Sequence, residues 1–85
     1  MNMVAKGKSF EVEVEGFFDE DGFRMMLRLL KGYGSVRKTS FDAQRIAPAA
    51  LAKFMVFTMH DAETIKVLLA QVSRNSKIKV EEDHD

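Results

Sequence analysis

The chain has 85 residues, of which 46% are hydrophobic and 31% are charged, and its formal net charge is zero. These values are typical of one small globular domain and exclude general disorder. The absence of cysteine excludes disulfides, thiol catalysis and cysteine-ligated zinc. No apolar run reaches the roughly 18 residues that a membrane span needs, and the N-terminus lacks the apolar core of a signal peptide. We therefore expect a cytoplasmic domain without membrane contact.

A strand and a helix are predicted first. Residues 9–16 alternate apolar and acidic side chains, a period of two that indicates a strand with one buried and one charged face. The apolar positions are Phe10, Val12 and Val14, and the acidic ones are Glu11, Glu13 and Glu15. Asp19 is a suitable N-cap for a helix that Gly32 or Gly34 ends. The apolar stripe of this helix comprises Phe23, Met26, Leu27 and Leu30.

The middle of the chain contains the most apolar stretch. Residues 35–41 have moderate strand propensity and suit an edge strand. We interpret residues 42–50 as a loop, and one helical turn that starts at Pro48 is an alternative for its end. Residues 51–59 are predicted to form a central strand that is apolar on both faces. Phe54 and Val56 share one face of this strand, and Met55, Phe57 and Met59 share the other.

A second helix and a last strand follow. Asp61 is predicted to cap a helix over 62–74, with Asn75 after its end. Its apolar stripe is Ile65, Leu68, Leu69 and Val72. Residues 76–81 again have a period of two, with Ile78 and Val80 inward and lysines outward. We expect one domain over 1–85, with its core at 9–81 and flexible termini at 1–8 and 82–85.

The order strand, helix, strand, strand, helix, strand predicts an α+β, ferredoxin-like two-layer sandwich. The right-handed crossover rule places both helices on one face of a sheet with strand order 4-1-3-2. The last strand then runs antiparallel to the first. Lys77 and Lys79 would lie beside the glutamates of residues 11–15, and Lys6 and Lys8 would meet the acidic residues 81–83.

The uncovered sheet face is the candidate functional surface. The central strand must present one of two sets of side chains on that face: Met55, Phe57 and Met59, or the set with Phe54. In the alternative, residues 42–50 or the termini fold over these side chains and cover them. Exposed apolar patches with polar rims usually mark an interface. We therefore expect a non-enzymatic interaction or regulatory module that binds a protein partner or forms a homodimer, since symmetric dimers are the commonest assemblies.

A second candidate surface is basic. Residues 24–53 carry seven basic side chains and one acidic one, so the middle of the chain is positive and its ends are negative. A patch is predicted from Arg24, Arg28, Lys31, Arg37 and Lys38. The alternative function is that of a small inhibitor that docks this basic helix face on an acidic or nucleic-acid-binding partner.

The topology over residues 9–81 resembles ferredoxin-like modules, in particular small ACT-type regulatory domains. Such domains carry a glycine between the first strand and the first helix, and Gly22 lies near that place. The resemblance implies a ligand loop at Gly22 and sensing of a small molecule such as an amino acid. Arg24 departs from the small apolar pattern that usually follows the glycine.

The RNA-recognition motif has the same topology, but its paired aromatic residues lie two positions apart, whereas Phe54 and Phe57 lie three apart. The glutamates of the first strand would also repel phosphate, which argues against nucleic acid.

No catalytic constellation, cofactor site or metal site is predicted. His60 stands beside Asp61, but the sequence shows no nucleophile that would complete a catalytic relay with them. The two histidines are not spaced as metal ligands are. The segment Gly7-Lys8-Ser9 lacks the first glycine and the following helix of a phosphate-binding loop.

Overall fold

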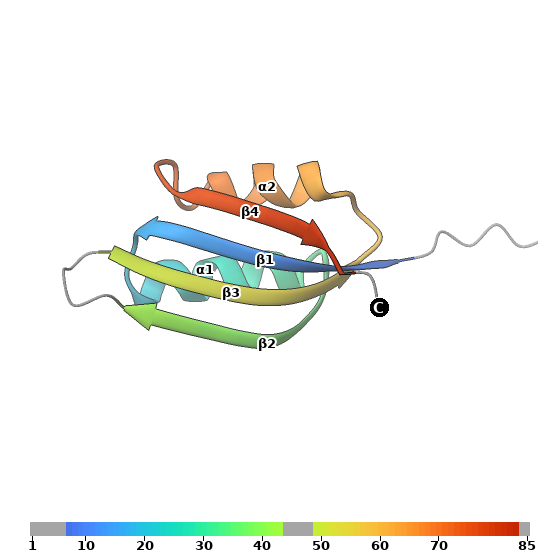
Figure 1. Cartoon of the computed structure of the whole chain (residues 1–85), viewed down its shortest axis with the longest axis horizontal. Coiled ribbons are helices and arrows are strands. Elements are labelled where there is room, and N and C mark those ends of the chain that lie inside the picture. Colours follow the sequence, from blue (N-terminus) through green and yellow to red (C-terminus); the bar gives the residue numbers. More distant parts are fainter. Residues whose placement is uncertain (1–6, 44–48, 84–85) are drawn as a thin grey trace, which may run out of the picture.

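The computed structural model describes residues 7–43 and 49–83. Its elements are β1 (Lys8–Phe17), α1 (Glu20–Lys31), β2 (Gly34–Ala43), β3 (Ala49–Thr58), α2 (Ala62–Ala70) and β4 (Lys77–Glu82). Figure 1 shows the four strands in the order β2-β3-β1-β4, and each neighbouring pair is antiparallel. The predicted α+β, ferredoxin-like sandwich and its strand order are confirmed.

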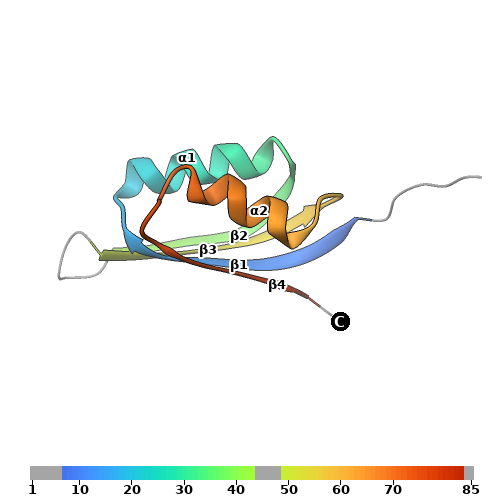
Figure 2. The same cartoon turned by 90° about the horizontal axis from the view of Figure 1, so that it is seen from above.

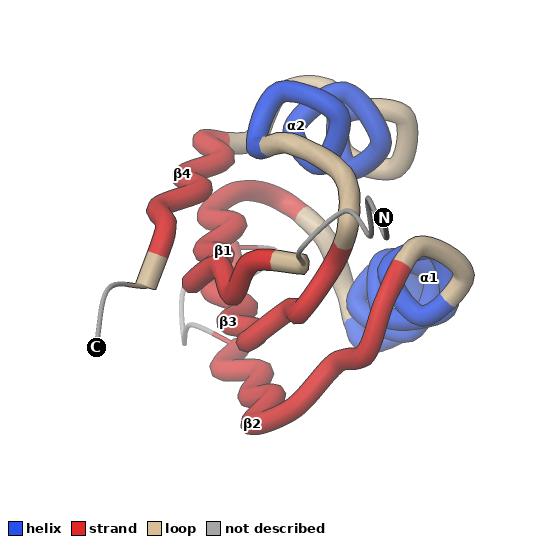
Figure 3. Tube along the Cα trace, turned by 90° about the vertical axis from the view of Figure 1, so that its right-hand side faces the viewer, coloured by secondary structure: helices blue, strands red, loops and turns tan. Residues whose placement is uncertain are grey.

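Both helices lie on the same side of the sheet. Figure 2 shows α1 and α2 above the strands, and the end view of Figure 3 shows the same two layers. α1 contacts β2, and α2 contacts β4, so each helix covers one half of the sheet. We call the opposite side of the sheet, which bears no helix of the described part of the chain, the open face.

The hydrophobic core lies between the two layers. Alternate residues of the central strands point into it: Phe10, Val12 and Val14 of β1, and Ala50, Ala52, Phe54 and Val56 of β3. The helices contribute Met26, Leu30, Ile65, Leu68 and Leu69. Since side chains alternate along a strand, residues 51, 53, 55 and 57 must lie on the open face.

Four phenylalanine rings pack at one end of the core. Phe23 of α1 stacks on Phe54 with ring centroids 5.4 Å apart and on Phe41 of β2 at 5.1 Å. Phe18, which precedes the helix, approaches Phe41 at 6.0 Å. Offset stacking of this kind adds to the free energy gained from burial alone. The rings therefore join α1 to both β2 and β3.

Aspartates cap both helices as predicted. Gly22 N donates to Asp19 Oδ1 at 3.0 Å, and Thr64 N donates to Asp61 Oδ1 at 2.9 Å. The Thr64 hydroxyl donates to the same oxygen at 2.7 Å. The two bonds from Thr64, that of the hydroxyl first, lower the pKa of Asp61 below its usual value because they stabilise the carboxylate.

The element boundaries differ from the predicted ones. Residues 42–43 and 49–50, expected in a loop, belong to β2 and β3, because the ladder continues through Asp42 opposite Leu51 and Ala43 opposite Ala50. The turn expected at Pro48 lies outside the described residues. α2 ends at Ala70, four residues before the predicted end.

Two residues expected in flexible termini belong to strands. Lys8 opens β1 and Glu82 closes β4, and Lys8 Nζ lies 3.8 Å from Glu82 Oε1. This ion pair agrees with the expected meeting of basic and acidic segments; its other basic member, Lys6, lies outside the described residues.

β2 contains a bulge. Arg37 pairs with Met55 and Ser40 pairs with Lys53, so Lys38 and Thr39 together stand opposite one residue of β3. Lys38 has a φ of 48°, in the left-handed region that favours glycine. The extra residue shifts the alternation, so that Val36 before the bulge packs against the core and Phe41 after it stacks on Phe23 on the same side of the sheet.

Replacing Lys38 by glycine should stabilise the protein. The left-handed conformation costs a residue with a Cβ about 1–2 kcal/mol, more than the additional chain entropy that glycine loses on folding. We expect Lys38→Gly to raise the free energy of unfolding, measured with urea, by roughly 0.5–1 kcal/mol. The control Thr39→Gly should lower it by about as much. Equal changes at the two positions would contradict strain at Lys38.

Candidate functional site

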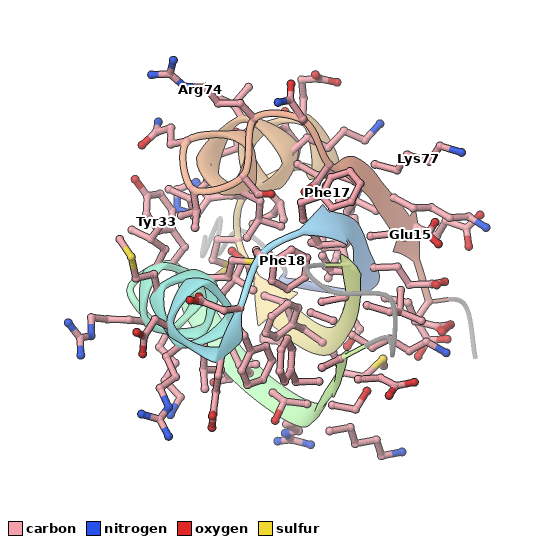
Figure 4. All side chains as sticks on the ribbon, turned by 90° about the vertical axis from the view of Figure 1, so that its left-hand side faces the viewer. Glu15, Phe17, Phe18, Tyr33, Arg74 and Lys77 are labelled. Carbon is pink, nitrogen blue, oxygen red and sulfur yellow. The ribbon has the colours of Figure 1, made fainter. Side chains whose placement is uncertain are left out.

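The strand register arranges the open face in rows that cross all four strands. From β2 to β4, the rows are Ser35–Phe57–Ser9–Asp83, Arg37–Met55–Glu11–Glu81, Ser40–Lys53–Glu13–Lys79 and Asp42–Leu51–Glu15–Lys77. Asp83 joins the first row because its N–H donates to Ser9 O at 2.8 Å. Figure 4 shows Glu15 and Lys77 on the side of the strands away from both helices.

β3 supplies an apolar strip at the centre of this face, which we define as Leu51, Met55 and Phe57. Leu51 and Met55 are partly buried, whereas Phe57 is 49% exposed. Met59 follows the end of β3 and is 58% exposed. The strip lies beside polar and charged neighbours on β2 and β1, which is the arrangement of an apolar patch with a polar rim.

Gly7 allows the Phe57 ring to lie across the start of β1. A Cβ at Gly7 would stand 2.5 Å from two carbons of that ring. The ring therefore occupies the space that a side chain at position 7 would take. Aromatic cover of a glycine beside a neighbouring strand keeps the ring against the sheet, which leaves its outer surface exposed.

The charges of the open face follow a pattern across the strands. Glu13 stands between Lys53 of β3 and Lys79 of β4, and Glu15 stands opposite Lys77. The predicted pairing of the first strand's glutamates with the last strand's lysines is confirmed at these two positions. Glu11 is the exception, because it stands opposite Glu81, whose carboxylate lies 3.9 Å from the ammonium of Lys79 on the same strand. Two like charges directly opposite each other are unfavourable within a sheet.

Two shallow hollows indent the open face. One, of about 450 Å³, is lined by Ser9, Ser35, Arg37, Lys38, Met55, Phe57 and Asp83. The second, of about 410 Å³, shares Lys38, Met55 and Asp83 with the first and extends to Glu13 and Lys53. Cations thus line the β2 side of the first hollow and a carboxylate lines its β4 side.

The interface residues expected from the sequence divide between the two faces of β3. Met55 and Phe57 lie on the open face, and Met59 follows the strand. Phe54 is 2% exposed and stacks on Phe23 in the core, so it is not available to a partner. The alternative in which the set with Phe54 faces outward is wrong, because the helices cover that set.

The predicted basic patch does not form one surface. Arg28 and Lys31 lie on α1, as does Arg24, whose guanidinium binds Glu20 at 3.0 Å. Arg37 lies on the open face, on the other side of the sheet, and Lys38 lines the same hollows. The sequence grouped these five residues because they are close along the chain, whereas the sheet separates the helix from the outward side chains of β2.

Gly22 lies in the first turn of α1 rather than in a loop. Its N–H is already bonded to Asp19, and a Cβ there would stand 3.1 Å from Cβ of Phe18. The candidate ligand loop at this residue is therefore part of a capped helix start, where the amide that a ligand would use is occupied.

His60 has a structural position. Its ring meets the Tyr33 ring edge to face at 5.0 Å, and its backbone N–H donates to Thr58 Oγ1 at 3.1 Å. The Thr58 hydroxyl donates to Tyr33 O at 2.8 Å, which satisfies this buried side chain. Across residues 7–43 and 49–83, no three His, Asp or Glu side chains form a metal-binding group, and no helix is long and apolar enough to cross a membrane.

Leu51 and Lys53 belong to the open face and were not among the predicted site residues. A signal for them was present in the sequence. Lys53 has the same parity as Met55 and Phe57, so burying that set would also bury a lysine, which proteins avoid unless it is paired. The other set, which includes Ala52 and Phe54, contains no charge and was the better candidate for the core.

Comparisons with known proteins support the fold and no family. No protein-family model and no curated protein matches the chain. Similar solved structures include an unknown protein from Galdieria sulphuraria, with a TM-score of 0.73 and 16% identity over 94% of this chain and 47% of that one. An uncharacterised protein from Thermotoga maritima has a TM-score of 0.64 and 18% identity over 93% and 100% of the two chains. A de novo designed protein has a TM-score of 0.58 and 14% identity over 94% and 99%. The chain thus spans about half the length of the Galdieria protein, and at these identities the likeness concerns the fold alone.

Phe54 and Phe57 provide a matched test of which face is buried. Phe54→Glu places a carboxylate in the core and removes an aromatic ring, so we expect it to lower the free energy of unfolding by at least about 4 kcal/mol. Phe57→Glu changes an exposed position and should alter it by less than about 1 kcal/mol. Circular dichroism and urea unfolding of both variants measure this. Unfolding of Phe57→Glu with a folded Phe54→Glu would reverse the assignment.

Proposed function

We propose that the protein is a small, non-enzymatic interaction module that binds a protein surface through its open face. The observation that carries the proposal is the apolar strip of β3, which lies on the side of the sheet opposite both helices and is flanked by charged residues. Apolar side chains gain free energy when a partner removes them from water, at about 25 cal/mol per Å² of buried apolar surface.

The size of the open face suits a modest interface. Four strands about 4.8 Å apart and some 20–30 Å long give a footprint of roughly 400–600 Å². This is near the lower end of the area that each partner contributes to a specific complex. The flat shape of a sheet favours another flat surface over a deep insertion.

The charged side chains around the strip would determine orientation rather than most of the affinity. Arg37 and Lys38 lie on the β2 side, whereas Glu11 and Glu81 lie on the β1 and β4 side. Each edge also carries the opposite sign, Asp42 on β2 and Lys79 on β4, so a partner must match an ordered pattern of charges rather than one sign at each edge. Complementarity of this kind excludes wrong partners more than it strengthens the right one.

Methionine reactivity tests whether the open face is used. Met55 lies on that face, and Met25, on α1, is 56% exposed and serves as an internal control. We expect peroxide to oxidise Met55 more slowly relative to Met25 in concentrated protein, or in an extract of the producing cells, than in dilute purified protein. Mass spectrometry of the peptides gives both rates. An unchanged ratio in both settings would contradict use of the open face.

A second candidate function is the sensing of a small molecule, as in ACT-type domains. The first hollow favours it, because a floor of Met55 and Phe57 is flanked by Arg37 and Lys38 on one side and Asp83 on the other. Its volume of about 450 Å³ lies within the usual range for small-ligand sites. Opposite charges on the two sides suit a zwitterion such as an amino acid.

Nuclear magnetic resonance titration tests this candidate. Added amino acids should shift the amide signals of Ser35 and Arg37 and the methyl signal of Met55, because these residues line the hollow. The Gly22 amide serves as the reference, since it is occupied by Asp19. Shifts at Gly22 alone would favour a site at the helix start instead, and the absence of any shift at millimolar ligand would contradict sensing of these ligands.

A further inference from the structure

We infer that the open face binds the open face of a second copy of this chain, with a two-fold axis that runs along the strands between β3 and β1. The inference rests on the proposed function and adds to it the identity of the partner and the orientation of the complex. It is argued from the charge pattern of the four rows, which an axis along the strands makes complementary to itself.

The geometry of packed sheets leaves few arrangements. Two sheets that pack face to face lie about 10 Å apart and keep their strand directions within about 30°. A symmetric pair is related by a two-fold axis in the plane between the sheets, which runs either along the strands or across them. An axis along the strands places each row over the same row of the second copy, in reversed order. β2 then lies over β4 of the second copy, and β3 lies over β1.

In this arrangement the central charges meet opposite charges. Arg37 faces Glu81 of the second copy, and Lys53 faces Glu13. In the last row, Asp42 faces Lys77. The two-fold axis makes each of these pairs occur twice. The remaining charged residues face hydroxyl or apolar groups, so no row places like charges opposite each other.

The same arrangement accounts for the unfavourable pair within the sheet. Glu11 and Glu81 stand directly opposite each other on β1 and β4. Arg37 of the second copy would lie over Glu81 and beside Glu11, where one guanidinium can bond to both carboxylates. In the monomer Glu81 Oε2 lies 3.9 Å from Lys79 Nζ, and the two carboxylates together thereby form a binding site for a further cation, supplied by the partner.

The apolar strips also meet. Because the axis passes between β3 and β1, the strip of each copy lies beside the strip of the other in the gap between the sheets. Phe57 and Met55 extend from both sides into this gap, so they can interdigitate across the axis. Their contact would bury the half of the Phe57 side chain that the monomer leaves exposed.

The other face-to-face arrangement is less favourable. An axis across the strands reverses the order of the rows and keeps β1 over β1. Glu81 then faces Lys79 of the second copy and Asp83 faces Lys77, but Glu11 faces Glu13 twice, and neither Arg37 nor Lys53 faces a carboxylate. Like charges pressed together at an interface disfavour that arrangement. Pairing through the β2 edge is hindered by the bulge at Lys38, since bulges interrupt the ladder at an edge.

Exchange of charges between two variants tests the inference. In Arg37→Glu a carboxylate faces Glu81 of the second copy, and in Glu81→Lys an ammonium faces Arg37. We expect either variant alone to raise the Kd of the dimer at least about tenfold, and an equimolar mixture of the two to form a heterodimer of near wild-type affinity. Within one chain, Arg37 and Glu81 stand on opposite edges of the sheet, about 14 Å apart. At that distance their interaction is screened, so the recovered affinity of the mixture must come from contacts between the two chains.

Controls separate this inference from the proposed function. Arg28→Glu makes the same charge change on α1, in the other layer, and should leave the Kd unchanged. Asp42→Lys with Lys77→Glu forms a second exchange pair should either first variant fail to fold. Sedimentation velocity gives the Kd values, and native mass spectrometry of variants with different masses gives the heterodimer fraction.

Three outcomes would overturn the inference. A wild-type chain that stays monomeric to about millimolar concentration has no such dimer. If neither charge variant changes the Kd, the two copies associate in another orientation. Slower oxidation of Met55 in that dimer would still support the use of the open face. If Met55 stays as reactive in the dimer as in dilute protein, the two copies associate through an edge strand such as β4. That result contradicts both the inference and the use of the open face for self-association.

Discussion

The stacking of Phe54 on Phe23 decides which face of β3 the helices cover. The two rings lie 5.4 Å apart, and Phe23 also stacks on Phe41, so α1 is joined to both strands beneath it. Because side chains alternate along a strand, burying Phe54 sends every odd-numbered residue of β3 outward. The apolar strip of Leu51, Met55 and Phe57 and the position of Lys53 all follow from this one contact.

The open face exists because both helices of residues 7–43 and 49–83 lie on the same side of the sheet. Both helices lie on the side that right-handed crossovers dictate, so the other side depends on its own side chains to remain compatible with water. Glutamates and lysines alternate around the strip there, and Gly7 lets the Phe57 ring lie against the sheet. The same charges give the face a direction, since its cations and anions are not evenly distributed between β2 and β4.

The bulge of β2 links the core to this face. Lys38 takes a left-handed conformation that costs free energy, and the extra residue turns Phe41 toward α1 while Arg37 and Ser40 stay outward. Strain at one residue thus allows the aromatic cluster and the cationic edge of the open face to coexist in one strand. The first hollow, which borders Arg37 and Lys38, lies beside the same bulge.

The order of elements, the two helix caps and the sheet topology could be read from the sequence, because periodicity, capping residues and crossover handedness are local or chiral rules that depend little on packing. The opposite-charge pairs of β1 and β4 followed from that topology. The sequence also contained a signal for the bulge, because Val36 and Phe41 lie five positions apart and can face one core only if a residue is inserted between them.

The outward face of β3 and the division of the basic residues were not predicted. Phe54 with Val56 and Met55 with Phe57 are nearly equal in apolar surface, so only the packing of rings from α1 and β2 distinguishes them. Arg28 and Arg37 are near in sequence, yet the sheet lies between them, because a strand after a helix turns its side chains to both faces.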